Sequence, residues 1–361
     1  MLRVRHQLRW FNAVSVEATS EQVRALAALP FVERLELVRG FRRGAPETPR
    51  TEAPGFWIPR KKPDEKKPDD DDDSTPAVDY GPSRGQLEQI NVPAVHRLGF
   101  HGEGVVIAMF DSGFDNLAHE AFSDTRVTHR RDFVNGDGDV ANGADMGEGS
   151  HGTATLSTIG GFRTGQIVGP AFAATYLLAK TENTDSETPV EEDNWVAAAE
   201  WAEGLGADVI SCSLGYLEYD APFPSYRWSD MDGDTAISTR AADLAAERGV
   251  VVVASAGNNG SNSSHNTLGA PADGHRVIAA GAVTSWGSRA SFSSVGPSAD
   301  GRVKPDVAAQ GQDVYTAGSS HSSSYQYVDG TSFSCPLTAG VAALVLQAHP
   351  DYSVDQVIAV L

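Results

Sequence analysis

The sequence is poor in cysteine. Only Cys212 and Cys335 are present among 361 residues, and both lie in apolar stretches. We therefore expect two buried free thiols, and a disulfide framework, which needs several pairs, is excluded. Long apolar runs are also lacking, so no membrane span is expected. Residues 1–6 do not lead into the apolar core of a signal peptide, so a signal for export would lie upstream or have been removed.

Basic residues are in the minority. Lys and Arg number 28 against 48 Asp and Glu, which gives a net charge of −20. Phosphate binding needs clustered Lys and Arg, so nucleic acid is excluded as a partner. The acidic surface fits either a saline habitat or simple solubility. The length is enough for one large α/β domain and a smaller one.

The first 80 residues divide into two parts. Residues 1–44 read as a small β-α-β unit, with strands at 11–16 and 31–38. Between them, Thr19 and Gln22 form a capping box for a helix that stops before Pro30. Residues 45–80 hold many prolines and an acidic run, a composition that does not fold, and we predict a charged linker there.

The remainder, residues 81–361, alternates between strand and helix patterns. Strands are expected at 105–110, 207–213, 250–254, 275–283 and 306–309, and helices at 90–98, 153–159, 193–204, 239–248, 331–349 and from 353 onward. This alternation predicts an α/β fold, a mainly parallel sheet with helices on both faces. Sites in such folds lie at the carboxyl ends of the strands.

Four polar residues stand at such ends or at helix starts. Ser332 opens an apolar helical run, where the positive end of the helix favours developing negative charge, although serine at a helix start is often only a cap. Asp111 ends one predicted strand, Asn258 follows another, and His151 lies in the segment SHGTAT. An acid, a histidine, an amide and a serine are the parts of an acyl-transfer site.

Their order along the chain carries a resemblance. Asp, His and Ser in this order are typical of subtilisin and differ from the chymotrypsin and α/β-hydrolase orders. The chain therefore resembles the subtilisin-like serine peptidases, the subtilases, over residues 81–361. The segments SLG at 213–215 and RASFSSVGP at 289–297 add to the resemblance.

The resemblance implies a role for each of the four residues. Asp111 would orient His151, His151 would act as general base, and Ser332 would form the acyl-enzyme. Asn258 would donate its amide to the oxyanion. The family's usual HGTH and TSMA stand here as HGTA and TSFS, which leaves the groups that make and break bonds in place.

It also implies a groove for polypeptide substrates. The substrate-binding residues expected are Ser213, Leu214, Gly215, Ala256, Gly257 and Gly269. Asn259 stands where some relatives carry an acid, which favours broad, apolar-leaning specificity. Glu191 and Glu192 lead to the hypothesis of a mild preference for basic residues two to four positions before the cut.

Residues 1–44 resemble the second half of a subtilase pro-domain, with the first strand and helix shortened or missing. The resemblance implies a secreted serine endopeptidase made as a zymogen, with its own pro-domain as a partner and maturation within the linker. The alternative for this unit is an accessory domain without inhibitory role. For the whole chain the alternative is a catalytically silent peptide-binding relative; an esterase or lipase is disfavoured because the Gly-x-Ser-x-Gly elbow is missing around Ser332.

The sequence also contains candidate metal ligands. Acidic residues crowd two loops, 132–148 and 230–234, and offer the oxygen ligands that Ca²⁺ prefers, but neither follows the EF-hand pattern. The alternatives are one structural Ca²⁺ or solvated acidic loops. No cofactor is expected for the chemistry itself.

Overall fold

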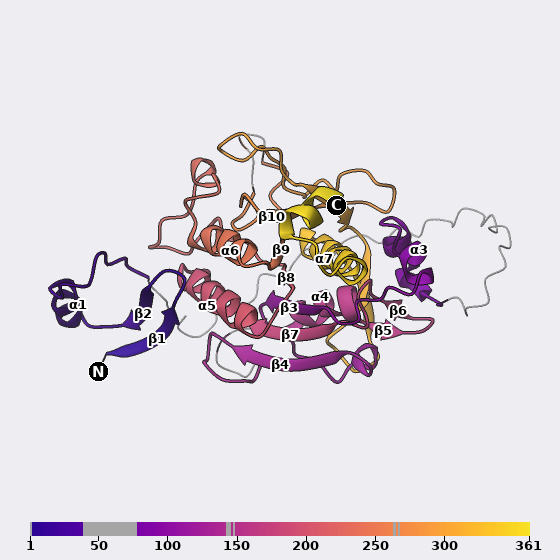
Figure 1. The fold of residues 1–361 in the computed structure, drawn as a ribbon, viewed down its shortest axis with the longest axis horizontal. Coiled ribbons are helices and arrows are strands. Elements are labelled where there is room, and N and C mark those ends of the chain that lie inside the picture. Colours follow the sequence, from indigo (N-terminus) through magenta and orange to yellow (C-terminus); the bar gives the residue numbers. More distant parts are fainter. Residues whose placement is uncertain (1, 39–77, 142–145, 147–148, 263–264, 266–267) are drawn as a thin grey trace.

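A computed structural model describes residues 2–38, 78–141, 146, 149–262, 265 and 268–361 (Figure 1). Most of the predicted linker lies outside these residues.

The central sheet consists of seven strands in the order β11-β10-β9-β8-β3-β7-β4, and all its pairs are parallel. The strands are β3 (Val106–Asp111), β4 (Arg126–Asp132), β7 (Thr175–Lys180), β8 (Val209–Cys212), β9 (Val251–Ser255), β10 (Val277–Val283) and β11 (Val307–Gln310). The predicted parallel α/β sheet is confirmed.

Helices cover both faces of this sheet (Figure 1). Side chains alternate along a strand, so Ala108 and Phe110 of β3 join the core with α5 (Val190–Gly204) and α6 (Ile237–Glu247). Ile107 and Met109 join the opposite core with α4 (Ser150–Gly160) and α7 (Thr331–Ala348). A strand buried on both faces is apolar throughout, and the sequence of β3 shows this. Both cysteines are buried and free, as predicted.

Smaller elements complete the fold. They are β5 (Phe162–Arg163), β6 (Ile167–Val168), β12 (Val314–Ala317), β13 (Tyr325–Val328), α2 (Arg84–Glu88), α3 (Val92–Arg97) and α8 (Val354–Val360), with 3₁₀ turns η1 (Gly81–Ser83), η2 (Glu120–Phe122) and η3 (Trp228–Asp230).

Helix α7 corrects one expectation. By length and composition alone its 18 residues could cross a membrane, contrary to the prediction that no apolar run is long enough. However, 72% of the helix is buried inside the protein. The helix packs between the sheet and the elements that face solvent, and this burial accounts for its apolar character.

The N-terminal unit differs in part from its prediction. It consists of β1 (Arg3–Leu8), β2 (Ala13–Glu17) and α1 (Ser20–Ala27), and it lies at one end of the molecule beside α5 (Figure 1). The capping box of Thr19 and Gln22 is confirmed. The strand at 3–8 was not predicted. The strand predicted at 31–38 is wrong, because that alternating segment pairs with no strand among the described residues and Phe31 is 79% exposed.

Candidate active site

The site is built at the carboxyl edge of the sheet. Asp111 is the last residue of β3, Ser213 follows β8, and Asn258 lies in the loop after β9. Because these strands are parallel, their ends meet at one edge. His151 enters from the start of α4 and Ser332 from the start of α7.

Asp111 and His151 form a direct hydrogen bond. His151 Nδ1 lies 2.7 Å from Asp111 Oδ1, and the carboxylate is fully buried. Oδ2 of Asp111 accepts from the hydroxyl of Thr155 at 2.8 Å, so both oxygens are held in place. With Nδ1 donating to the carboxylate, Nε2 is left as the acceptor nitrogen of the neutral ring.

The charge of Asp111 governs the basicity of His151. Burial lowers the pKa of the imidazole, but the Asp111 carboxylate raises it through its charge and its hydrogen bond, and the net pKa lies above 6.5. The side chain of His151 is 35% exposed, so the ring is only partly buried. His151 is thus a stronger base than a free histidine while keeping access to solvent.

Ser332 and Ser213 bind each other reciprocally. Pro336 lies inside α7 and has no N–H, so it cannot donate to the carbonyl four residues earlier, that of Ser332. The hydroxyl of Ser213 donates to this carbonyl instead, at 2.8 Å. Ser332 Oγ donates to the carbonyl of Ser213 at 3.2 Å. The ring of Phe333, the next residue, lies 5.7 Å from that of His151, which places the start of α7 beside the imidazole.

Asn258 is oriented by Thr331. Its Oδ1 accepts from both the amide and the hydroxyl of Thr331, each at 2.9 Å. The amide of Gly257 in turn donates to the Thr331 hydroxyl at 3.2 Å. Because Oδ1 is occupied in this way, the Nδ2 group of Asn258 is the part of the side chain that can donate to a ligand.

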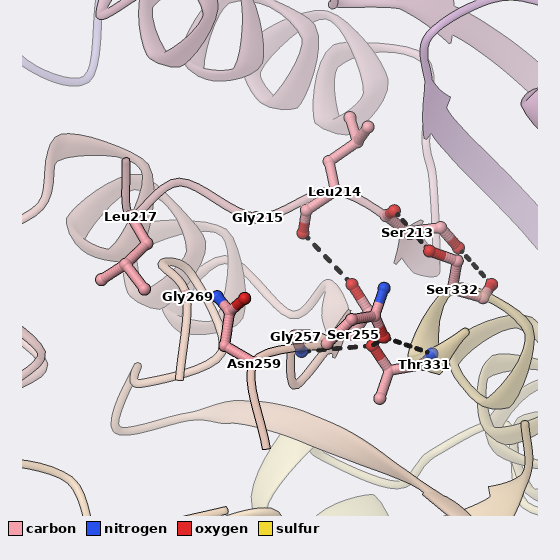
Figure 2. Close-up of a pocket in the computed structure, with 11 residues that line it drawn as sticks. Ser213, Leu214, Gly215, Leu217, Ser255, Gly257, Asn259, Gly269, Thr331 and Ser332 are labelled. Atoms are coloured by element: carbon pink, nitrogen blue, oxygen red, sulfur yellow. Dashed lines mark hydrogen bonds between the residues drawn. The ribbon is translucent and has the colours of Figure 1, made fainter. Parts of the chain in front are cut away.

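A pocket opens beside Ser332 (Figure 2). Its lining includes five of the six predicted substrate-binding residues: Ser213, Leu214, Gly215, Gly257 and Gly269. Ala256 is the exception. It is fully buried, its amide donates to the carbonyl of Ala280, and its carbonyl accepts from the amide of Gly269. Ala256 therefore supports the residues that line the pocket and does not line it itself. Leu217 and Asn259 lie on the side of the pocket away from Ser332 (Figure 2).

The predicted role of Glu191 and Glu192 in selecting basic residues meets a physical obstacle. Both lie in the first turn of α5 and are at most 2% exposed. Oε1 of Glu192 accepts from Tyr219 and Tyr226, and Oε2 accepts from the amide and hydroxyl of Ser238. These carboxylates lie in the protein interior, so we do not propose that they select basic residues of the substrate.

The two acidic loops use their described carboxylates locally. Asp132 pairs with the buried Lys180 at 3.3 Å and accepts the amides of Val134 and Asn135. Asp232 accepts two amides and the hydroxyl of Thr235. Asp145 and Glu148 lie outside the described residues.

Two positioning threonines were not recognised from the sequence. Thr155 holds Asp111, and Thr331 holds Asn258. The position of Thr331 directly before Ser332 was a hint of its role. Its hydrogen-bond partner, Asn258, lies in a loop 73 residues away in sequence, so the contact itself could not be predicted.

A parallel α/β sheet with a carboxylate-imidazole pair beside a helix-terminal serine and an amide is the arrangement of hydrolases that work by acyl transfer. Comparison with known proteins narrows this class. The family model described as Subtilase family, Peptidase S8, matches residues 102–361, and the Peptidase S8 propeptide domain of Bacteroidota matches residues 1–52.

Individual relatives agree with the family models. The chain is 35% identical to Subtilisin DY of Bacillus licheniformis over 74% of this chain and 86% of the relative, and 34% identical to Subtilisin of Bacillus pumilus over 78% and 89%. A cold-adapted subtilisin-like serine proteinase of solved structure superposes with a TM-score of 0.55 at 27% identity, over 73% of this chain and 82% of that one. The chain belongs to the subtilase family. It is a serine endopeptidase with a propeptide domain.

Proposed function

We propose that the chain is a self-maturing endopeptidase in which Ser332 is the nucleophile, His151 the general base and Asp111 the orienting acid. The observation that supports this most is the 2.7 Å contact between His151 and the buried Asp111, next to the start of α7.

The reaction follows from these positions. Ser332 Oγ leaves its contact with the Ser213 carbonyl by rotation about its Cα–Cβ bond, gives its proton to Nε2 of His151 and attacks the scissile carbonyl carbon. The resulting imidazolium is stabilised by Asp111 and then protonates the leaving amine. Water, activated by the same imidazole, hydrolyses the acyl-enzyme and regenerates Ser332.

The oxyanion is stabilised from two sides. Asn258 Nδ2 donates from the loop after β9, and the amide of Ser332 donates from the first turn of α7, where N–H groups have no helical partner. All these groups belong to the chain itself, so the proposed steps require no cofactor. A structural Ca²⁺ is a separate matter of stability.

The substrate is proposed to bind as an extended strand along residues 213–215. Main-chain hydrogen bonds of this kind give affinity with little sequence preference. The pocket offers Leu214, Leu217 and the neutral amide of Asn259, which supports a broad specificity that favours apolar side chains before the cut.

The N-terminal unit is proposed to act as an intramolecular pro-domain. Two main-chain amides, of Arg9 and Trp10, donate to the carboxylate of Glu200 on α5, both at 2.9 Å. Ser15 donates to Asp193 at the start of the same helix at 2.6 Å. We assign residues 1–44 to the pro-domain, 45–80 to the linker in which maturation occurs, and 81–361 to the catalytic domain. Secretion is proposed on the basis of the relation to subtilisins.

A fluorophosphonate probe tests the assignment of Ser332. Wild type is expected to gain one adduct, and peptide mapping should place it on Ser332, whereas Ser332→Ala should gain none. The silent peptide-binding alternative predicts that both proteins stay unlabelled, even after the linker has been nicked with trypsin to free the groove.

A further inference from the structure

The loop from β7 to α5 gathers three carboxylates that the proposed reaction does not use. Glu182 and Glu187 lie in this loop and Glu191 in the first turn of α5. One carboxylate oxygen from each lies within 4.8 Å of the others. Glu182 is 7% and Glu191 1% exposed, while Glu187 is only partly covered.

Three carboxylates in such a place repel one another. Burial, together with the charge of the neighbouring carboxylates, raises the pKa of Glu187 to about 8 and that of Glu191 to about 10. None of the ion pairs among the described residues involves Glu182, Glu187 or Glu191. The cluster therefore has no positive charge from the described chain to balance it.

Neutral donors nevertheless hold two of the carboxylates in fixed positions. Oε1 of Glu182 accepts from the hydroxyl of Tyr216 at 2.6 Å and from that of Thr181 at 3.0 Å. Glu191 accepts the amides of Asn183 at 3.2 Å and Thr188 at 3.0 Å, which lie on either side of Glu187 along the loop. The loop is thus folded around its own acids.

A buried hydroxyl beside the cluster is left without a partner. Thr188 follows Glu187 in sequence, its amide binds Glu191, and the residue is 1% exposed. Its Oγ1 has no hydrogen-bond partner among the described residues. Buried hydroxyls are nearly always satisfied, so this one indicates a bound ligand or an ordered water next to Thr188.

We propose that Glu182, Glu187 and Glu191, together with the hydroxyl of Thr188, bind one divalent cation, and that Ca²⁺ is the ion that fits. The ligands are all hard oxygens, and Ca²⁺ accepts a flexible set of carboxylates and neutral oxygens. Mg²⁺ fits less well because it demands near-octahedral geometry and retains most of its water. Glu187, the exposed member, provides the route of entry.

A substrate guanidinium or ammonium group is the rival occupant. Glu182 and Glu191 are both more than nine-tenths buried, so a long basic side chain cannot reach all three carboxylates from the groove. A bare ion can. The cluster is also separate from the two acidic loops at 132–148 and 230–234.

The test uses the full chain carrying Ser332→Ala, which prevents self-digestion, after treatment with EDTA and dialysis. Ca²⁺ binding is measured by calorimetry, and Tb³⁺ luminescence is excited through tyrosine, because Tyr216 lies 2.6 Å from Glu182. Glu187→Gln and Glu191→Gln are compared with Glu203→Gln, a control on the same helix.

We expect each cluster variant to bind one Ca²⁺ fewer per chain and to lose most of the tyrosine-sensitised Tb³⁺ emission, while Glu203→Gln binds as the parent does. Circular dichroism confirms that each protein is folded. Unchanged Ca²⁺ stoichiometry and Tb³⁺ emission in Glu187→Gln and Glu191→Gln would overturn the proposal. So would a parent protein that binds no Ca²⁺, whether or not it binds basic peptides in a way that Glu187→Gln removes.

Discussion

The carboxyl edge of the sheet and the N-terminal unit are held by different kinds of contact. At the edge, Asp111 and Ser332 are fixed by residues of the core, and both lie in elements packed between buried layers. Among its described residues the N-terminal unit buries Leu8 and Ser15, and α1 buries no residue. The unit meets α5 through polar contacts and packs Leu8, Trp10 and Phe11 against the core. Polar contacts of this kind are worth about 1–3 kcal/mol each. If the unit is the pro-domain that we propose, we expect it to leave without disturbing the site, because the hydrogen bonds that hold Asp111 and Ser332 do not involve it.

The largest effect is expected at the edge itself. Ser332→Ala should lower kcat on a peptide substrate by roughly a millionfold, a loss known from subtilisin itself, because the nucleophile is removed. Ser334→Ala, in the same turn of α7, serves as the control, since its hydroxyl only donates to the Ala309 carbonyl. A Ser332→Ala protein that keeps more than a thousandth of wild-type turnover contradicts the assignment.

Asp111→Asn should be next, with a loss of about ten-thousandfold in kcat. The protonated form of His151 is inactive as a base, so kcat/KM of wild type falls as the pH drops through the His151 pKa, which Asp111 holds above 6.5. Removing the charge lowers this pKa, and the acid limb of the profile moves to lower pH. Asp115→Asn, whose carboxylate accepts from Thr153, should leave the limb in place.

Asn258→Ala should lower kcat by roughly a hundred- to a thousandfold with little change in KM, again a loss known from subtilisin, because the amide acts on the transition state. The neighbouring residue, Asn259, tests whether the two asparagines have separate roles. Asn259→Ala should alter KM and the preference for the residue before the cut, since Asn259 lines the pocket. Equal losses of kcat in both variants would refute the separate roles.

The smallest effect concerns the N-terminal unit. Glu200→Gln in the Ser332→Ala chain should speed the hydrogen exchange of the Arg9 and Trp10 amides about tenfold, as expected from losing about 1.4 kcal/mol of charge-assisted hydrogen bonding. Glu203→Gln, three residues later on α5, is the control. Exchange that stays at the parent rate would mean that Glu200 does not hold the unit.

The fold was predictable where burial leaves a continuous apolar signal. Strands β3 and β9 and helix α7 were found in this way, since both faces of each are covered. Strand β4 was missed because it is an edge strand whose exposed Arg, Thr and His side chains carry no alternation. Strand β7 was missed as well, although all but its first residue is buried. The segment 31–38 alternates but pairs with no strand in the described part of the chain, so an alternating pattern forms a strand only when a partner strand is available.

The site was predictable where chemistry requires a residue type in a motif. Asp111, His151, Asn258 and Ser332 were named in this way. The Asp111–His151 contact agrees with the roles expected of these two residues, and the catalytic roles of all four stay predictions. The supporting hydroxyls of Thr155 and Thr331 and the cluster around Glu191 were not, because each depends on which distant backbone segments the sheet brings together.

Intact mass spectrometry of wild type and Ser332→Ala, purified side by side, tests the central claim most directly. Self-maturation predicts that wild type loses an N-terminal segment ending between residues 45 and 80, while Ser332→Ala keeps it. A wild type that remains unprocessed, and that stays unlabelled by a fluorophosphonate after a trypsin nick in the linker, would contradict the claim.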